Sequence, residues 1–139
     1  MYAMKRIVCF LIVSIAFLSC QKNGDASKDV LIGKWKLTKA ETEQVSRGES
    51  QIVTSSTYNN SYSQFNEDGT VKVFSEDGKI TEYVYSYDKE NMTLTIASHT
   101  RSIKELTNSS LITYETQQFV DGTPEGGKAY FYSYYSKVK

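Results

Sequence analysis

Hydrophobic and polar residues alternate along most of the chain with a period of two, which is the pattern of half-buried β-strands. For example, Met92, Leu94 and Ile96 alternate with threonines. Short turn sequences interrupt the alternation. Two of them contain Asp-Gly, at residues 67–69 and 76–78, where glycine accepts the positive φ of a tight hairpin. The pattern predicts eight strands, at residues 31–40, 61–66, 70–76, 79–87, 92–98, 101–106, 110–120 and 128–138.

The short connections between these segments favour an all-β fold in which each strand pairs antiparallel with the next. Eight such strands most simply close as an up-and-down barrel, because closure removes the exposed sheet edges. The alternative is a sandwich of two sheets, which usually needs longer crossover connections. We therefore predict an eight-stranded antiparallel barrel over residues 30–139.

Residues 41–60 are the one long interruption between predicted strands. This segment is polar and weakly patterned, so the sequence leaves open a loop, a short helix or an irregular strand that begins at Gln51. Loops of more than about 12–15 residues often cover binding sites. The competing interpretation is a disordered excursion.

The first 20 residues have a different pattern. Lys5 and Arg6 precede an almost entirely apolar run at residues 7–18, and polar residues follow directly after Cys20. This layout is typical of an export signal, and the run is shorter than the roughly 20 residues that a membrane-spanning helix needs. The sequence Phe17-Leu18-Ser19-Cys20 resembles the lipobox of bacterial lipoproteins, in which the signal is cut before the cysteine and the thiol is acylated.

The lipoprotein interpretation divides the chain into a signal peptide at residues 1–19, a flexible polar tether at 20–29 and a folded domain at 30–139. Lipid on Cys20 would anchor the protein to a membrane. The alternative is an ordinary secreted protein, which would normally have a small residue three positions before the cut, whereas Phe17 is large.

Charge and cysteine content narrow the function further. The whole chain carries 16 basic and 16 acidic residues, and two of the basic ones lie in the predicted signal. The remaining chain is slightly acidic with mixed charges, so we expect no nucleic-acid partner, which would require a basic face. Cys9 also lies in the signal, so Cys20 is left without a cysteine partner for a disulfide.

The sequence contains no arrangement of residues that indicates enzymatic chemistry. His99 is the single histidine and lies at a predicted turn. No His/Cys/Asp cluster has metal-ligand spacing, and the two Asp-Gly turns lack the alternating oxygen ligands of a calcium loop. No glycine-rich segment joins a strand to a helix, as phosphate binding would require. We therefore predict neither enzymatic activity, nor a metal site, nor a cofactor.

Tyrosines are the main candidates for a ligand site. Aromatic rings on predicted strands could line a cavity and stack on a flat or apolar molecule, with the phenols orienting it. The alternative is that the tyrosines are ordinary strand residues that fill a narrow barrel completely. The last predicted strand is aromatic on both faces, so its pattern does not decide which face points inward. The five candidate ligand-binding residues are Tyr83, Tyr85, Tyr87, Tyr114 and Tyr132.

Several short motifs occur in an order that is typical of one family. They are Gly33-x-Trp35, Phe65-x-x-Asp68-Gly69-Thr70, Tyr85, Leu94-Thr95-Ile96, Ile103-x-x-Leu106-Thr107 and Leu111. With these motifs the chain resembles the lipocalin-like domains found in many lipoproteins of Bacteroidetes-type bacteria. The resemblance implies a lipocalin-like (calycin) barrel whose narrow end is closed by Trp35, with Gly33 leaving room for the indole ring. Larger lipocalins place a basic residue of the last strand against this tryptophan, and Lys137 is the candidate here.

We expect, from these observations together, a membrane-anchored lipocalin-like lipoprotein that binds a small hydrophobic or aromatic ligand in its barrel. The alternative is a structural or interaction module of the cell envelope, with a filled barrel and an envelope protein as its partner. Surface-exported lipoproteins of such bacteria tend to carry acidic residues directly after the cysteine, and Gln21-Lys22-Asn23 is not acidic. This favours an outer-membrane position that faces the periplasm.

Overall fold

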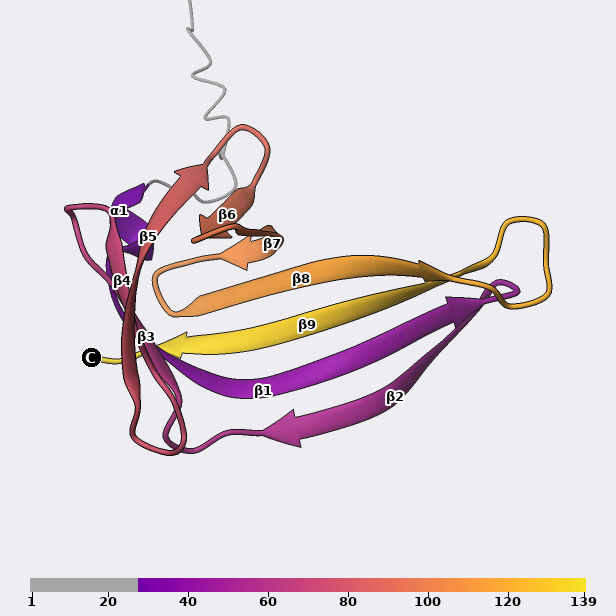
Figure 1. The fold of residues 1–139 in the computed structure, drawn as a ribbon, viewed down its shortest axis with the longest axis horizontal. Helices are drawn as coiled ribbons and strands as arrows, with labels where there is room; N and C mark the ends of the chain where they lie inside the picture. Colours follow the sequence, from indigo (N-terminus) through magenta and orange to yellow (C-terminus); the bar gives the residue numbers. More distant parts are fainter. Residues whose placement is uncertain (1–27) are drawn as a thin grey trace, which may run out of the picture.

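The computed structural model describes residues 28–139. The predicted signal peptide, Cys20 and most of the predicted tether lie outside the described residues. One short helix is followed by nine strands (Figure 1): α1 (Lys28–Leu31), β1 (Gly33–Ser46), β2 (Glu49–Thr57), β3 (Tyr62–Phe65), β4 (Thr70–Phe74), β5 (Ile80–Asp88), β6 (Thr93–Ile96), β7 (His99–Leu106), β8 (Ser110–Phe119) and β9 (Gly127–Lys137). Within residues 28–139, no helix has the length and apolar character needed to cross a membrane.

All strands pair antiparallel in one sheet, in the order β2-β1-β3-β4-β5-β6-β7-β8-β9. The sheet closes because β1 also pairs with β9, from Trp35 opposite Lys137 to Val45 opposite Lys128. The ring runs from β1 through β3 to β9 and back to β1, which makes eight strands around the barrel. The predicted all-β up-and-down barrel is confirmed, and the two-sheet sandwich is wrong.

The strands differ greatly in length, so the barrel is complete at only one end. Strands β3, β4 and β6 have four or five residues, whereas β1, β2, β8 and β9 have nine to 14. Figure 1 shows these four longer strands extending to one side as a curved sheet. We call this part the projecting wall; it comprises residues 39–46, 49–57, 115–119 and 127–131.

Residues 41–57 complete a hairpin and are not a loop, a helix or a disordered excursion. Of the predicted alternatives the strand is right, although it begins at Glu49 and not at Gln51. Strand β1 continues to Ser46, and β2 returns from Glu49 to Thr57. Arg47 and Gly48 make the turn between them with φ values of 52° and 79°, as a two-residue hairpin turn with positive φ at both positions requires. Every residue of β2 is exposed, so no hydrophobic alternation marked it in the sequence.

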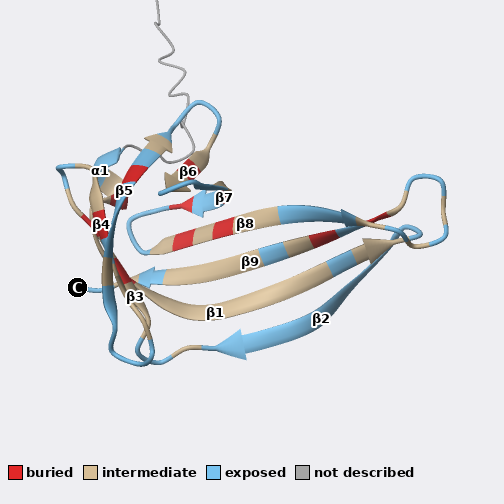
Figure 2. Ribbon diagram, in the orientation of Figure 1, coloured by how far each residue is buried: buried red, intermediate tan, exposed pale blue. Residues whose placement is uncertain are grey.

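The hydrophobic core occupies the narrow end of the barrel, where the short strands close the ring (Figure 2). Inward-facing side chains from seven strands and the helix meet there. Among the described residues, no buried side-chain nitrogen or oxygen lacks a hydrogen-bond partner. The narrow end is therefore filled with side chains and contains no unpaired polar group. The core residues are Leu31, Trp35, Phe65, Val71, Tyr85, Leu94, Ile103, Leu106 and Leu111.

Trp35 is the floor of this core. Its side chain is fully buried, and its indole Nε1 donates a hydrogen bond of 2.7 Å to the carbonyl oxygen of Leu31. Lys137 Nζ lies 5.1 Å from the centre of the indole ring and donates to the carbonyl oxygen of Val30 at 2.7 Å. A Cβ atom on Gly33, whose φ is +123°, would lie 3.0 Å from Lys137 Cε. Gly33 therefore leaves room for the lysine that lies across the ring, and the prediction that it makes room for the indole itself is wrong.

We predict that Trp35→Ala lowers the free energy of unfolding by about 3–5 kcal/mol, because the substitution opens a cavity beneath the core and removes a buried hydrogen bond. Denaturant titration followed by circular dichroism measures this change. Val120→Ala, at the most exposed valine of the domain, is the control and should change stability by less than about 0.5 kcal/mol. Equal stability of the two variants would show that Trp35 does not close the barrel.

Candidate functional site

A pocket of about 320 Å³ lies at the wide end of the barrel, above the filled core. The strand register brings its inner wall together: Leu37 of β1 lies opposite Tyr135 of β9, and Ser63 of β3 lies opposite Val73 of β4. Ser63 is also the partner of Trp35, so the pocket lies beside the tryptophan floor. Its lining residues are Leu37, Tyr58, Ser61, Tyr62, Ser63, Val73, Phe74, Ser75, Glu76 and Tyr135.

Hydrogen bonds hold the rim of this pocket in place. One carboxylate oxygen of Glu76, Oε1, accepts the backbone N–H groups of Asn59 at 2.8 Å and Asn60 at 2.9 Å. These bonds, with a weaker one from the Ser61 hydroxyl at 3.4 Å, lower the pKa of Glu76. The connection between β2 and β3 is therefore fixed against the β4–β5 turn by a carboxylate that stays ionised.

Arg101 places a positive charge on the inner face beyond the core. Its Nε donates to Thr113 Oγ1 at 3.1 Å, and its Nη2 donates to the Phe131 carbonyl at 2.9 Å and to Ser133 Oγ at 3.2 Å. Its Nη1 lies 3.4 Å from Glu115 Oε1. Arg101 thus connects the first part of β7 to both β8 and β9. Beyond this point β8 and β9 continue into the projecting wall without β7.

Tyr135 lies between this arginine and the pocket. Burial raises the pKa of its phenol, while the charge of Arg101 and a hydrogen bond with Ser133 act in the opposite direction. The Tyr135 hydroxyl is therefore neutral at physiological pH. It offers the pocket a polar group that can donate or accept a hydrogen bond.

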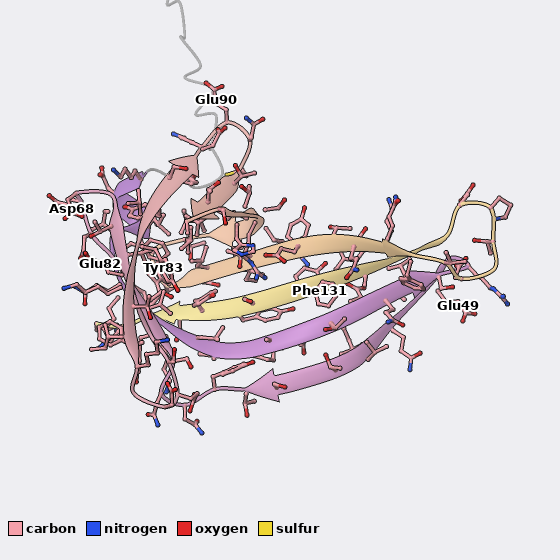
Figure 3. All side chains as sticks on the ribbon, in the orientation of Figure 1. Glu49, Asp68, Glu82, Tyr83, Glu90 and Phe131 are labelled. Atoms are coloured by element: carbon pink, nitrogen blue, oxygen red, sulfur yellow. The ribbon has the colours of Figure 1, made fainter. Side chains whose placement is uncertain are left out.

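The structure places the three predicted tyrosines of β5 at different depths. Tyr85 is buried in the core, where its hydroxyl donates to the Asn66 carbonyl at 2.9 Å, and Tyr87 packs against the same core. Tyr83 lies opposite the buried Val71 but is 39% exposed, because β6 pairs with β5 only from Tyr85 onward. Of these three, only Tyr83 faces the open side of the barrel (Figure 3).

Tyr114 and Tyr132 lie on the outer face of the barrel. They belong to a row that we call the tyrosine ladder, whose neighbouring ring centres are 5.7–6.2 Å apart: Tyr114, Tyr130, Tyr132 and Tyr134. Tyr135 and Leu111 point inward, so the alternate positions on β9 and β8 point outward. The five tyrosines predicted to bind a ligand therefore do not line one cavity.

Charged residues of β1 contact the side chains of the tyrosine ladder and fix their positions against the outer face of the sheet. The Tyr134 hydroxyl hydrogen-bonds to Glu41, and burial together with this bond raises the pKa of Tyr134 to about 12. Lys39 Nζ lies 2.9 Å from Glu41 Oε1 and 4.3 Å from the centre of the Tyr134 ring. The hydrogen bonds from Lys39 and Tyr134 lower the pKa of Glu41. The same pattern recurs one step along the strand, where Tyr132 hydrogen-bonds to Glu43.

Four pocket residues were not predicted from the sequence: Leu37, Tyr58, Val73 and Tyr135. One signal for Tyr135 was present, because it stands two residues before Lys137. A lysine that lies against the inward-facing Trp35 puts every second residue of the last strand on the inner face as well. The sequence carried no comparable signal for Tyr58, which follows directly after the exposed strand β2.

Residues 31–113, more than half of the chain, match the family model of the lipocalin-like domain. The chain belongs to this family. The matched segment contains Gly33 and Trp35 and ends in β8, before the strand that carries Tyr135 and Lys137. A lipocalin-like protein from Bacteroides uniformis is a similar solved structure, at 19% sequence identity and a TM-score of 0.38; the alignment covers 73% of this chain and 96% of that one. No curated protein is significantly similar to the chain.

The contacts of the tyrosine ladder predict a titration in this lipocalin-like domain. Because the pKa of Tyr134 is raised from 10.0 to about 12 on folding, its neutral form stabilises the fold fully below pH 10. This stabilisation is lost as the pH rises toward 12. Tyr134→Phe should therefore lose less stability than the wild type between pH 10 and 12, as measured by denaturant titration at each pH.

Glu41→Gln tests the cause of the shift. Removing the carboxylate should lower the pKa of Tyr134, which is followed by the ultraviolet absorbance of tyrosinate and assigned by its absence in Tyr134→Phe. Glu49→Gln, an exposed change at the tip of the wall, should leave the titration unchanged. An unaltered Tyr134 titration in Glu41→Gln would contradict the contact.

Proposed function

We propose that this lipocalin-like domain binds a small hydrophobic or aromatic molecule in the pocket at the wide end of the barrel, and that a lipid on Cys20 holds it at the cell envelope. The single observation that carries the ligand proposal is the pocket of about 320 Å³ between Leu37, Val73 and Tyr135. No catalytic step is part of the proposal.

The size and chemistry of the pocket indicate the kind of ligand. Its volume is at the lower end of the roughly 300–1,000 Å³ found for small-molecule sites. Leu37 and Val73 supply apolar surface, while the hydroxyls of Tyr58, Ser63 and Tyr135 supply polar groups. Because Trp35 and its neighbours fill the barrel below, a ligand does not enter deeper. A molecule of one or two rings, or a short branched chain, suits this space.

Aromatic residues near the opening extend the apolar surface. Phe131 lies on the inward-facing side of β9, as Tyr135 does, and is 36% exposed. Tyr83 lies on the inner face of β5. Figure 3 shows Tyr83 close to the barrel and Phe131 farther out along the projecting wall. A ligand larger than the pocket would therefore meet further apolar surface as it leaves the barrel.

A second candidate function is an interaction module of the envelope with no ligand. The tyrosine ladder favours it, because Tyr130, Tyr132 and Tyr134 lie half-buried on the outer face, and aromatic residues are enriched at protein interfaces. The core at the narrow end is also filled, as this function requires. The pocket remains the feature that the interaction module does not explain, so ligand binding is the first proposal.

Filling the pocket should weaken binding. We predict that Val73→Phe weakens binding of the neutral two-ring fluorophore 6-propionyl-2-(dimethylamino)naphthalene by about tenfold or more, because the added ring occupies the space between Val73 and Tyr135. The measurement is fluorescence titration of the chain from residue 20, with Cys20 replaced by serine. This chain includes every described element of the fold.

Val84→Phe is the matched control for this experiment. It makes the same substitution on the neighbouring strand, at an outward-facing valine that is 72% exposed, and should leave the affinity unchanged within about twofold. A wild-type protein that neither binds the fluorophore nor retains a small molecule in native mass spectrometry after purification from its host would contradict ligand binding.

The anchor is tested separately. Cells grown with labelled palmitate should incorporate the label into the wild-type protein and not into Cys20→Ser, and the variant should leave the membrane fraction. Several acyl chains on one residue bind a membrane far more firmly than the marginal binding of one chain. Equal labelling of both proteins would show that Cys20 is not the acylated residue.

A further inference from the structure

Strand β2 forms an open edge of the sheet. In the strand order it has β1 as its one neighbour, and all nine of its residues are exposed (Figure 2). One side of its backbone therefore presents N–H and C=O groups to solvent. An extended backbone edge of this kind is a template for pairing with another strand.

The edge is held in an extended conformation along its whole length. Ser50 and Ser55 of β2 hydrogen-bond through their hydroxyls to Glu43 and Glu41 of β1. Beyond the end of β2, Tyr58 donates its backbone N–H to the Thr38 carbonyl at 3.1 Å. These contacts order the strand before any partner arrives, which reduces the entropy that pairing would cost.

The hairpin tip is also fixed. Ser46 Oγ donates to Asp121 Oδ2 at 2.6 Å, and Arg47 Nη2 donates to the Asp121 carbonyl at 3.3 Å. Both bonds cross from the β1–β2 turn to the connection between β8 and β9. The β1–β2 hairpin and the β8–β9 hairpin of the projecting wall are therefore joined at their far ends.

β2 has few of the features that protect an exposed edge. Soluble proteins usually place lysine, proline or inward-pointing charges on such strands, and β2 has no lysine, arginine or proline. Its one charged residue, Glu49, is at its first position, and Ile52 and Val53 in its centre are 51% and 41% exposed. One protective feature is present, a β-bulge that leaves Val53 without a partner on β1.

We propose that β2 pairs antiparallel with β2 of a second copy of this chain, so that two projecting walls form one continuous sheet. The charge distribution favours a second copy. In an antiparallel pair, the two Glu49 residues lie at opposite ends, and all other side chains of the two strands are uncharged, so no like charges meet. The same surface serves both subunits, as a two-fold dimer requires.

The bulge defines where the pairing is regular. Residues 54–57 continue beyond Val53 with unbroken alternation against β1, so the two-fold axis passes near this segment. Ile52 and Val53 then lie beside the far end of the partner's strand, where they lose exposed apolar surface. No pocket residue lies on β2 itself, although Tyr58 follows it directly, and the test below needs no ligand, so this inference stands independently of the proposed ligand.

Sedimentation equilibrium of the chain from residue 20 with Cys20→Ser tests the proposal. The wild type should show a monomer–dimer equilibrium. Ile52→Lys/Val53→Lys should raise the dimer dissociation constant about tenfold or more, since it removes both apolar side chains and adds positive charge at the edge. Ile80→Lys/Val84→Lys is the matched control: it makes the same two changes at exposed residues of β5 and should leave the constant unchanged.

Single cysteines at Thr54, Ser55 and Ser56 locate the axis. The residue nearest the axis should form a disulfide-linked dimer much faster than the other two. A wild-type protein that stays monomeric up to about 1 mM, or a dimer that the β5 variant weakens as much as the β2 variant, would overturn the proposal. The first result would show that β2 does not pair with itself, and the second would place the interface elsewhere.

Discussion

The pairing of the first strand with the last is the interaction on which the rest of the structure depends. It closes the sheet into a ring, and its register does two things at once. It sets Lys137 against Trp35, which seals the narrow end, and it sets Tyr135 against Leu37, which builds one wall of the pocket. If β9 slipped by one residue, Lys137 and Tyr135 would turn to the other face and lose their contacts with Trp35 and Leu37. Closure of the barrel and formation of the pocket are therefore one structural event.

The pocket exists because inward-facing side chains change in size from one layer to the next. Strands of four or five residues contribute only two or three inward positions each. On β3 these are Phe65 and Ser63, and both are buried. Phe65 fills the lower layer, where it packs edge-to-face on Tyr85 with ring centres 5.0 Å apart. Ser63 occupies the upper layer, and its small side chain leaves the space that Leu37, Val73 and Tyr135 enclose.

Hydrophobic alternation predicted the strands that have one buried face, and it failed where both faces are exposed. Leu94 and Ile96 mark β6 because only one side of that strand meets the core. β2 has no buried side and so left no pattern to detect. The prediction that five tyrosines line a ligand cavity failed for a related reason. Tyrosine packs well on either face of a sheet, so its presence on β9 does not reveal whether Tyr132 or Tyr135 points inward.

A single extra residue in β1 explains why the two faces are distributed as they are. The pairing with β9 shifts between Leu37 and Lys39, which leaves Thr38 as a bulge, and the Thr38 hydroxyl donates to the Tyr134 carbonyl at 3.0 Å. Before the bulge the odd-numbered residues Trp35 and Leu37 point inward. Without it, Lys39, Glu41 and Glu43 would continue on that inner face and put three charges above the pocket.

The bulge reverses the alternation and sends these three residues to the outer face. There Lys39 and Glu41 contact Tyr134, and Glu43 contacts Tyr132. Glu41 and Glu43 also hold Ser55 and Ser50 of β2. One backbone irregularity thus leaves the inner face of β1 free of charge beyond the pocket, anchors the tyrosine ladder and orders the exposed edge strand. The bulge at Thr38 therefore allows one strand to line the pocket with its first part and to carry the projecting wall with its second part.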